Sequence, residues 1–193
     1  MWLCCLFVSF LILADESPDE IALQPGSGYL LIRVICPAGE RIARLDMTNL
    51  ETGAVITTRS DMYESAGQKA WMAMVAIPEG RYFWSEYEPT YYVGLEQPRL
   101  NRVLKRSGPS SASDTFEIVP GVINYAGDWV MQLMHVKRAP TISHKMETVE
   151  RLVDRYPEYT KRYEIYLSMM GKKAISLKEF LNIVKEHSGQ VTE

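Results

Sequence analysis

The stretch AWMAMVAIPEGRYFWSEY, residues 70–87, holds two runs of β-forming residues on either side of Pro78-Glu79-Gly80. Proline and glycine in this arrangement are typical of a tight reversal, so we expect a β-hairpin here. Gly80 is expected to need the positive φ that only glycine adopts at low cost, which makes its role structural. The stretch therefore predicts a fold of short strands joined by turns.

Similar runs lie on both sides of this stretch. Tyr29–Cys36 predicts a buried strand, residues 42–59 predict a hairpin, and residues 115–136 predict two or three more strands. Roughly seven to nine short strands are expected between residues 28 and 136, with no helical segment to make the crossovers of a parallel sheet. We therefore predict a mainly β chain with an antiparallel β-sandwich over residues 28–136.

From Pro140 onward the apolar residues recur at helical instead of strand spacing. Two or three helices are expected within residues 141–189, with Pro157 opening the second helix and the pattern continuing towards Gly171. The apolar stripe of this helical C-terminal segment comprises Val149, Leu152, Val153, Tyr156, Tyr159, Tyr163 and Leu167. Such a stripe must be covered, either by the outer face of the sandwich, which we favour, or by a partner protein.

The N-terminus bears on the compartment. Trp2–Ala14 is an uncharged run too short to span a bilayer, which needs about 20 apolar residues, and an acidic stretch follows it. We expect residues 1–14 to be a signal peptide, which places the protein in the periplasm or outside the cell. A buried element of the fold and a short membrane anchor are the alternatives. Cys4 and Cys5 lie too early for a lipoprotein signal, and Cys36 is expected to be buried and inert.

Composition excludes some classes of protein and favours none. The chain has 193 residues, of which 47% are hydrophobic and 23% charged, so it is not a disordered chain. Its net charge of −3 gives no reason to expect nucleic acid as a partner. No metal-ligand spacing, phosphate loop or nucleophile elbow is present, so no cofactor, metal or catalytic residue is predicted. Asp128 beside Trp129 is expected to be structural.

Two features of the sequence are candidates for binding. One is a cluster of aromatic residues between Tyr82 and Tyr92, and the other is a segment rich in basic residues. Exposed aromatic rings stack on sugars or anchor protein interfaces, although strand alternation must bury about half of these rings in the core. The basic segment over residues 97–114 is expected to be a loop that can meet an anionic membrane surface. The candidate binding residues are Trp84, Tyr87, Tyr91, Tyr92, Arg99 and Arg102.

Three segments carry a resemblance to a known family. They are Glu51-Thr52-Gly53, the turn Ile77-Pro78-Glu79-Gly80-Arg81-Tyr82, and Phe116-x-Ile118-x-x-Gly121-x-Ile123-x-Tyr125-x-Gly127. Together they resemble the transthyretin-like or carboxypeptidase-regulatory-like β-sandwiches of uncharacterised bacterial exported proteins and lipoproteins. The resemblance implies an exported β-sandwich and carries over no catalytic residue.

Taken together, these features predict an exported, non-enzymatic binding or envelope-associated module. Its expected partners are an envelope protein, a glycan or an anionic membrane surface. A hydrolase of envelope polymers with its site in the sandwich loops is an alternative, which several carboxylates or histidines in one cleft would favour. A subunit of a larger assembly, docked through the helical C-terminal segment, is another.

Overall fold

The fold is taken from a computed structural model, which describes residues 21–36, 40–59, 69–91, 99–100, 104–105, 107–109, 115–130, 141–168 and 171–189. The chain is mainly β, and the helices within these described residues are α1 (Met146–Arg155), α2 (Pro157–Arg162) and α3 (Leu177–Gly189), all of them short. The prediction of a mainly β chain with C-terminal helices is therefore confirmed. The signal peptide predicted at residues 1–14 lies outside the described residues.

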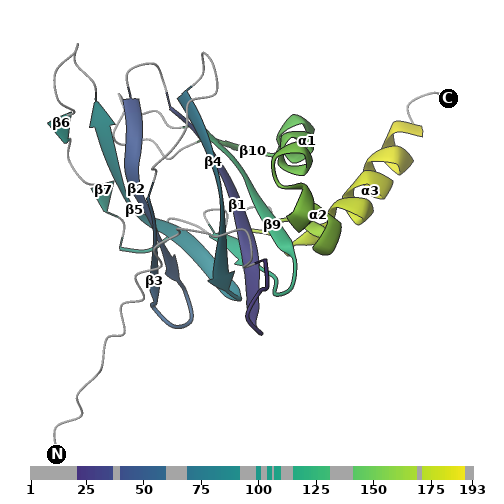
Figure 1. Ribbon diagram of the computed structural model, residues 1–193, viewed down its shortest axis with the longest axis horizontal. Helices are drawn as coiled ribbons and strands as arrows, with labels where there is room; N and C mark the ends of the chain where they lie inside the picture. Colours follow the sequence, from purple (N-terminus) through teal and green to yellow (C-terminus); the bar gives the residue numbers. More distant parts are fainter. Residues whose placement is uncertain are drawn as a thin grey trace, which may run out of the picture.

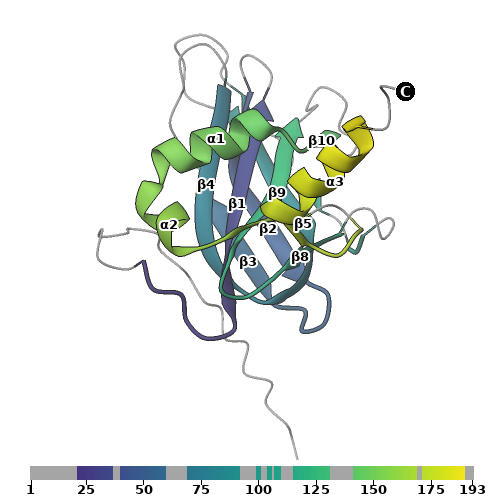
Figure 2. The same ribbon diagram turned by 90° about the vertical axis from the view of Figure 1, so that its right-hand side faces the viewer.

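The strands in the described parts of the chain form two sheets. The first sheet contains β1 (Ser27–Cys36), β4 (Lys69–Pro78), β9 (Ile123–Val130), β10 (Thr141–Ser143), β11 (Ile165–Leu167) and β12 (Ile175–Ser176). The second sheet contains β2 (Glu40–Asn49), β3 (Val55–Arg59), β5 (Gly80–Tyr91), β6 (Arg99–Leu100), β7 (Leu104–Lys105) and β8 (Thr115–Ile118). Figure 1 shows the second sheet, the first sheet and the helices as successive layers, and Figure 2 looks onto the helices lying over the first sheet.

The antiparallel prediction holds for only part of the fold. The described pairings of the second sheet are all antiparallel. In the first sheet β1 pairs antiparallel with β4, but β9 runs parallel to both β1 and β11. Parallel neighbours need a long crossover, and α1 and α2 supply one between β9 and β11. The C-terminal segment therefore contributes strands to the first sheet as well as helices.

The helix expected from Tyr159 towards Gly171 ends earlier than predicted. α2 stops at Arg162, and β11 follows at once with a strand-like burial pattern, in which Ile165 and Leu167 are buried and the residue between them is half-buried. A strand and a helix both fit a short apolar run, and pairing with β9 decides in favour of the strand here.

The turn at Pro78-Glu79-Gly80 is not a hairpin, contrary to the prediction. β4 pairs with β1, whereas β5 pairs with β2 and β8, so the turn passes the chain from the first sheet to the second.

The hairpin predicted over residues 42–59 is confirmed by the antiparallel pairing of β2 with β3. In its loop the Asn49 side-chain oxygen accepts hydrogen bonds from the backbone N–H groups of Glu51 and Thr52, both at 2.9 Å.

Gly80→Val is expected to destabilise this turn. Gly80 has a φ of +137°, and a Cβ added there would lie 2.5 Å from Nδ2 of Asn49, the residue that organises the neighbouring hairpin. The strained backbone of a valine at this φ and the displacement of the Asn49 side chain together predict a loss of about 1–3 kcal/mol in the free energy of unfolding. Thermal or urea unfolding measures this loss. Gly108→Val is the matched control, because an added Cβ at Gly108 meets no atom within 4 Å among the described residues. Equal melting curves for the two variants would contradict the prediction.

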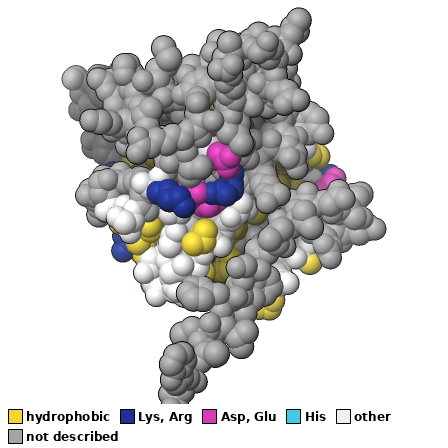
Figure 3. Space-filling view, turned by 90° about the vertical axis from the view of Figure 1, so that its left-hand side faces the viewer, with side chains coloured by type: hydrophobic (Ala, Val, Ile, Leu, Met, Phe, Trp, Pro, Cys, Tyr) yellow, Lys and Arg dark blue, Asp and Glu magenta, His cyan; other side chains and the backbone are white. Residues whose placement is uncertain are grey.

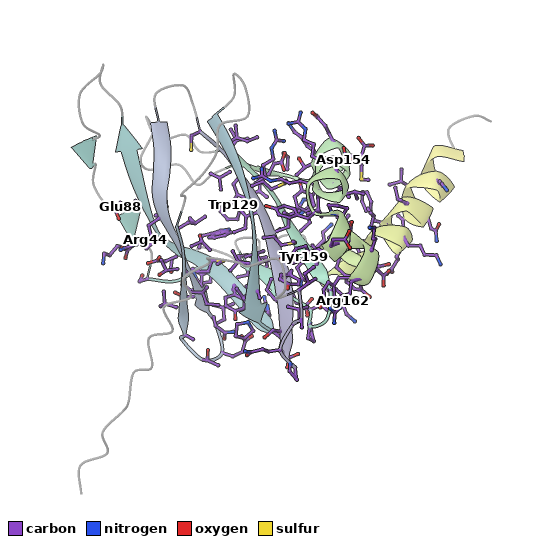
Figure 4. The ribbon with its side chains drawn as sticks, viewed as in Figure 1. Arg44, Glu88, Trp129, Asp154, Tyr159 and Arg162 are labelled. Atoms are coloured by element: carbon purple, nitrogen blue, oxygen red, sulfur yellow. The ribbon has the colours of Figure 1, made fainter. Side chains whose placement is uncertain are left out.

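Two apolar clusters lie on opposite faces of the first sheet. The cluster between the sheets includes Leu30, Ile32, Val34, Cys36, Leu45, Met47, Ile77, Tyr82, Trp84, Phe116, Ile118, Ala126 and Trp129. At its centre the rings of Trp84 and Trp129 meet edge to face, with 4.3 Å between their centroids, and Figure 4 shows Trp129 between the sheets. Burial of Cys36, which is 5% exposed, is as predicted.

The second cluster joins the outer face of the first sheet to the C-terminal segment. It includes Tyr29, Leu31, Met72, Ile123, Tyr125, Val149, Leu152, Ile165 and Leu167, with Tyr156, Tyr159 and Tyr163 packed against it. The apolar stripe is therefore covered by the sheet, as favoured from the sequence. Val153 is the exception, because its side chain is 44% exposed.

None of the helices in the described parts of the chain is long and apolar enough to cross a membrane.

Candidate functional site

A β-bulge in β9 places two polar side chains on the face of the first sheet that the helices cover. β1 and β9 pair Leu31 with Tyr125 but Arg33 with Asp128, so β9 carries one extra residue in this interval. Gly127 lies in the extra segment with a φ of +98°. A bulge shifts the alternation of side chains by one position, so Tyr125 and Asp128 project to the same face although they are three residues apart.

The Asp128 carboxylate is the centre of a buried hydrogen-bond cluster. Its Oδ2 accepts hydrogen bonds from Arg33 Nη1 at 2.9 Å and Thr148 Oγ1 at 3.0 Å, and its Oδ1 accepts one from the Tyr125 hydroxyl at 2.6 Å. Asp128 and Thr148 are fully buried, and Arg33 is 7% exposed. We call Arg33, Tyr125, Asp128 and Thr148 the buried cluster. Within the buried cluster the opposite charges of Arg33 and Asp128 are paired and hydrogen-bonded. These bonds also connect β1, β9 and α1.

Tyr125 is held in its neutral form. Burial raises the pKa of its hydroxyl, and the hydrogen bond to Asp128 raises it further, because a negative phenolate beside a carboxylate is unfavourable. The hydroxyl also accepts a hydrogen bond from the backbone N–H of Lys145 at 3.3 Å. Tyr125 therefore acts as a donor to Asp128 and as an acceptor at the start of α1.

His144 lies against the buried cluster. Its ring meets that of Tyr125 edge to face, with centroids 5.4 Å apart. Burial lowers the pKa of His144, while a hydrogen bond with the backbone of Ser168 and the charge of Asp128 oppose that shift. The structure thus brings a carboxylate, a tyrosine and a histidine together, which is the kind of grouping the hydrolase alternative needs. The carboxylate is fully buried, however, so the cluster is packed into the fold and is not a cleft open to a polymer.

His144 is expected to make stability depend on pH. Its pKa in the folded protein lies below the ordinary value of 6.5, so the unfolded chain binds the proton more readily. The stability that neutral His144 supports is therefore present above about pH 6.5 and is lost as the pH falls through the folded-state pKa. Urea unfolding between pH 7.5 and 5 should show a steeper loss for the natural protein than for His144→Gln. Glu150→Gln, at an exposed position of α1, is the control and should keep the steeper loss, and equal slopes for all three proteins would refute the assignment.

A second polar group lies on the outer face of the second sheet. We call Arg44, Asp46, Glu86 and Lys105 the charged strip, and Figure 3 shows charged side chains gathered on this face. Arg44 Nη2 bonds to Glu86 Oε1, Arg44 Nε lies 3.4 Å from Asp46 Oδ1, and Lys105 Nζ lies 3.0 Å from Glu86 Oε2. The side chain of Lys105 is 74% exposed, whereas that of Asp46 is 11% exposed.

Asp46 of the charged strip has a raised carboxyl pKa. Burial is the largest cause that raises the pKa of its carboxyl, and the negative charge of Glu86 adds to the shift. The hydrogen bond with Thr57 and the positive charges of Arg44 and Lys105 oppose it. The two carboxylates are thus neutralised by two cations within the strip, so it forms a balanced network of ion pairs and not a strongly charged surface.

The candidate binding residues do not form one exposed surface. Trp84 is 3% exposed in the core between the sheets, so the prediction that its ring is exposed for binding is wrong, because strand alternation turns it inward. Tyr87 is half-buried against the same core. The backbone register sets Tyr91 of β5 opposite Arg99 of β6. The side chains of Tyr91 and Arg99, and the whole of Tyr92 and Arg102, lie outside the described residues.

Sequence reasoning treated Asp128 as structural but missed its partners. A usable signal was present, because Arg33 is the one charged residue in Tyr29–Cys36 and Asp128 is the one charged residue in Ile123–Val130. Opposite charges, each alone in an apolar strand, predict a buried pair if the strands are neighbours. The pairing of β1 with β9 was not predicted, and Thr148 lies on a helix whose docking position was not known.

In the described parts of the chain, no group of three or more His, Cys, Asp or Glu side chains is placed to hold a metal ion. No family model matches the chain, and no curated protein matches its sequence. Among solved structures, a leucine-rich repeat protein from Bacteroides thetaiotaomicron VPI-5482 is similar over 56% of this chain, with 12% sequence identity and a TM-score of 0.40. The match spans 14% of that protein's length. A similarity at this level carries no conclusion about fold or function.

Proposed function

We propose that the chain is an exported, non-enzymatic binding module associated with the bacterial envelope. We further propose that its two sheets form a β-sandwich of the transthyretin-like kind. Apolar side chains from both sheets join in one cluster, which supports the sandwich. Parallel pairing of β9 makes the first sheet a mixed one, so the proposal covers the packing of the two layers and not a purely antiparallel topology.

Export is supported by the N-terminal sequence. Trp2–Ala14 has the length and apolar character of a signal-peptide core, and acidic residues begin immediately after it. Periplasmic or secreted protein is the expected product.

One observation carries the proposal of a binding role, namely the exposed apolar side chains of α3. Leu181, Ile183 and Val184 are 37%, 40% and 46% exposed. Figure 1 shows the C-terminal half of α3 leading away from the first sheet, and Figure 2 shows α1 and α2 lying over that sheet. Large apolar side chains grouped on one exposed element are typical of an interaction site.

Cell fractionation followed by intact-mass analysis tests the proposed export, with protein taken from the cells that naturally make it. We expect loss of residues 1 to about 14 and recovery from the periplasm or medium. Leu11→Arg places a charge in the apolar run and should block export, whereas Ala22→Arg, at an exposed position beyond the run, should not. Cytoplasmic protein that retains Met1 or Trp2 would show that the proposed function is wrong.

A further inference from the structure

The apolar residues of α3 form one stripe that is only half covered. Leu177, Phe180, Leu181 and Val184 recur at intervals of three and four residues, so they share one side of the helix. Leu177 and Phe180 pack against the apolar cluster of the first sheet. Leu181 and Val184 continue the same side beyond that contact and are exposed. The helix is therefore anchored at its start and presents apolar side chains on its middle turns.

Two lysines flank this exposed part of the stripe. Lys178 and Lys185 are the lysines of α3, and both side chains are exposed. Lys178 and Lys185 lie three residues before and four residues after Leu181, which places them along the edge of the stripe. Glu179 is also exposed, and helical spacing puts it on the side away from Leu181 and Val184.

This combination matches the chemistry of a helix that lies in a membrane interface. Such helices insert an apolar side at the boundary between headgroups and acyl chains, and lysines at its edge extend to anionic headgroups. α3 has 13 residues, a length of about 20 Å at 1.5 Å per residue, so it can lie along a bilayer. A second copy of the chain would bring the same lysines against one another, so charge favours an anionic surface over self-association.

We propose that the middle of α3 docks this protein on an anionic phospholipid surface, with Leu181 and Val184 in the interface and Lys178 and Lys185 facing the headgroups. This proposal depends on the proposed function, because it names the partner of an envelope-associated module. It requires no rearrangement of the sheets, since Leu177 and Phe180 keep their contacts with the fold.

Cosedimentation of the purified protein with vesicles tests the proposal at about 0.1 M salt. One vesicle type contains phosphatidylglycerol and phosphatidylcholine in equal amounts, and the other contains phosphatidylcholine alone. We expect binding to the anionic vesicles to be at least tenfold stronger. Leu181→Gln with Val184→Gln should lower that binding at least tenfold. Val153→Gln is the matched control, because Val153 is 44% exposed on α1 and lies outside the proposed interface.

Charge is tested separately from apolar contact. Changing Lys178 and Lys185 together to Gln should remove most of the preference for anionic vesicles, and raising the salt to 0.5 M should do the same. Thermal unfolding curves like those of the natural protein will show that these exposed substitutions leave the fold intact.

Three results would overturn the proposal. They are equal binding to both vesicle types, unchanged binding after the Leu181 and Val184 substitutions, and a dimer in sedimentation equilibrium that those substitutions abolish without any vesicle binding. The last result would assign the stripe to a second copy of the chain. Export is measured independently of vesicle binding, so an exported protein that ignores anionic vesicles contradicts this inference alone.

Discussion

Asp128→Asn is expected to lower the free energy of unfolding by about 3–5 kcal/mol, the usual cost of removing one partner from a buried ion pair. The substitution keeps the size of the side chain but leaves the guanidinium of Arg33 without its counter-charge at 8% side-chain exposure. Tyr125 and Thr148 donate to different oxygens of the carboxylate, and an amide keeps only one of these two acceptors, so one of the two hydroxyl groups then meets an NH2 group and loses its acceptor. Urea unfolding at pH 7.5, followed by tryptophan fluorescence, measures the loss.

Two further variants separate the lost charge pair from general damage to the fold. Arg33→Met combined with Asp128→Leu removes both charges, so the double variant should be more stable than Asp128→Asn alone. Asp154→Asn is the matched control, because Asp154 is exposed on α1, where Figure 4 labels it. Its effect should stay within about 0.5 kcal/mol. An Asp128→Asn protein as stable as the Asp154→Asn control would mean that the buried cluster does not stabilise the fold.

The contacts within the buried cluster could not be predicted from the sequence alone. Lone charges in two apolar strands mark Arg33 and Asp128 as unusual, yet their meeting depends on β1 lying beside β9, 95 positions away. It depends as well on the bulge, because regular alternation would have placed Tyr125 and Asp128 on opposite faces of the sheet. Local patterns identify strands, whereas neighbours and bulges are set by the packing of the whole chain.

The turn at Gly80 illustrates the same limit at the level of the fold. Its residues correctly predict a reversal at that position, with a glycine in a conformation of positive φ. They do not distinguish a hairpin, in which β4 and β5 would pair, from a passage between two layers, in which each strand finds other partners. Both arrangements need the same turn chemistry, so only the pairing of β1 with β4 decides between them.

The C-terminal segment was predicted best where its apolar residues are most numerous. Val149 and Leu152 repeat at helical spacing and are buried, as expected, against the first sheet. The run at Ile165–Leu167 is too short for its period to be decisive, and it becomes a strand because β9 offers unpaired backbone groups beside it. Helix boundaries were therefore the weakest part of the prediction.

Leu152→Ala is expected to lower the free energy of unfolding by about 2–5 kcal/mol, because it leaves a cavity where α1 packs on the first sheet. Leu152 is fully buried there, whereas its neighbour Val153 is 44% exposed, so Val153→Ala provides a control on the same helix. The control should change stability by no more than about 0.5 kcal/mol. Urea unfolding of both variants, with solubility followed in parallel, compares the two sides of α1. Equal small effects would mean that the helices are not a necessary cover for the first sheet, and the apolar stripe would then have to be assigned to a partner protein.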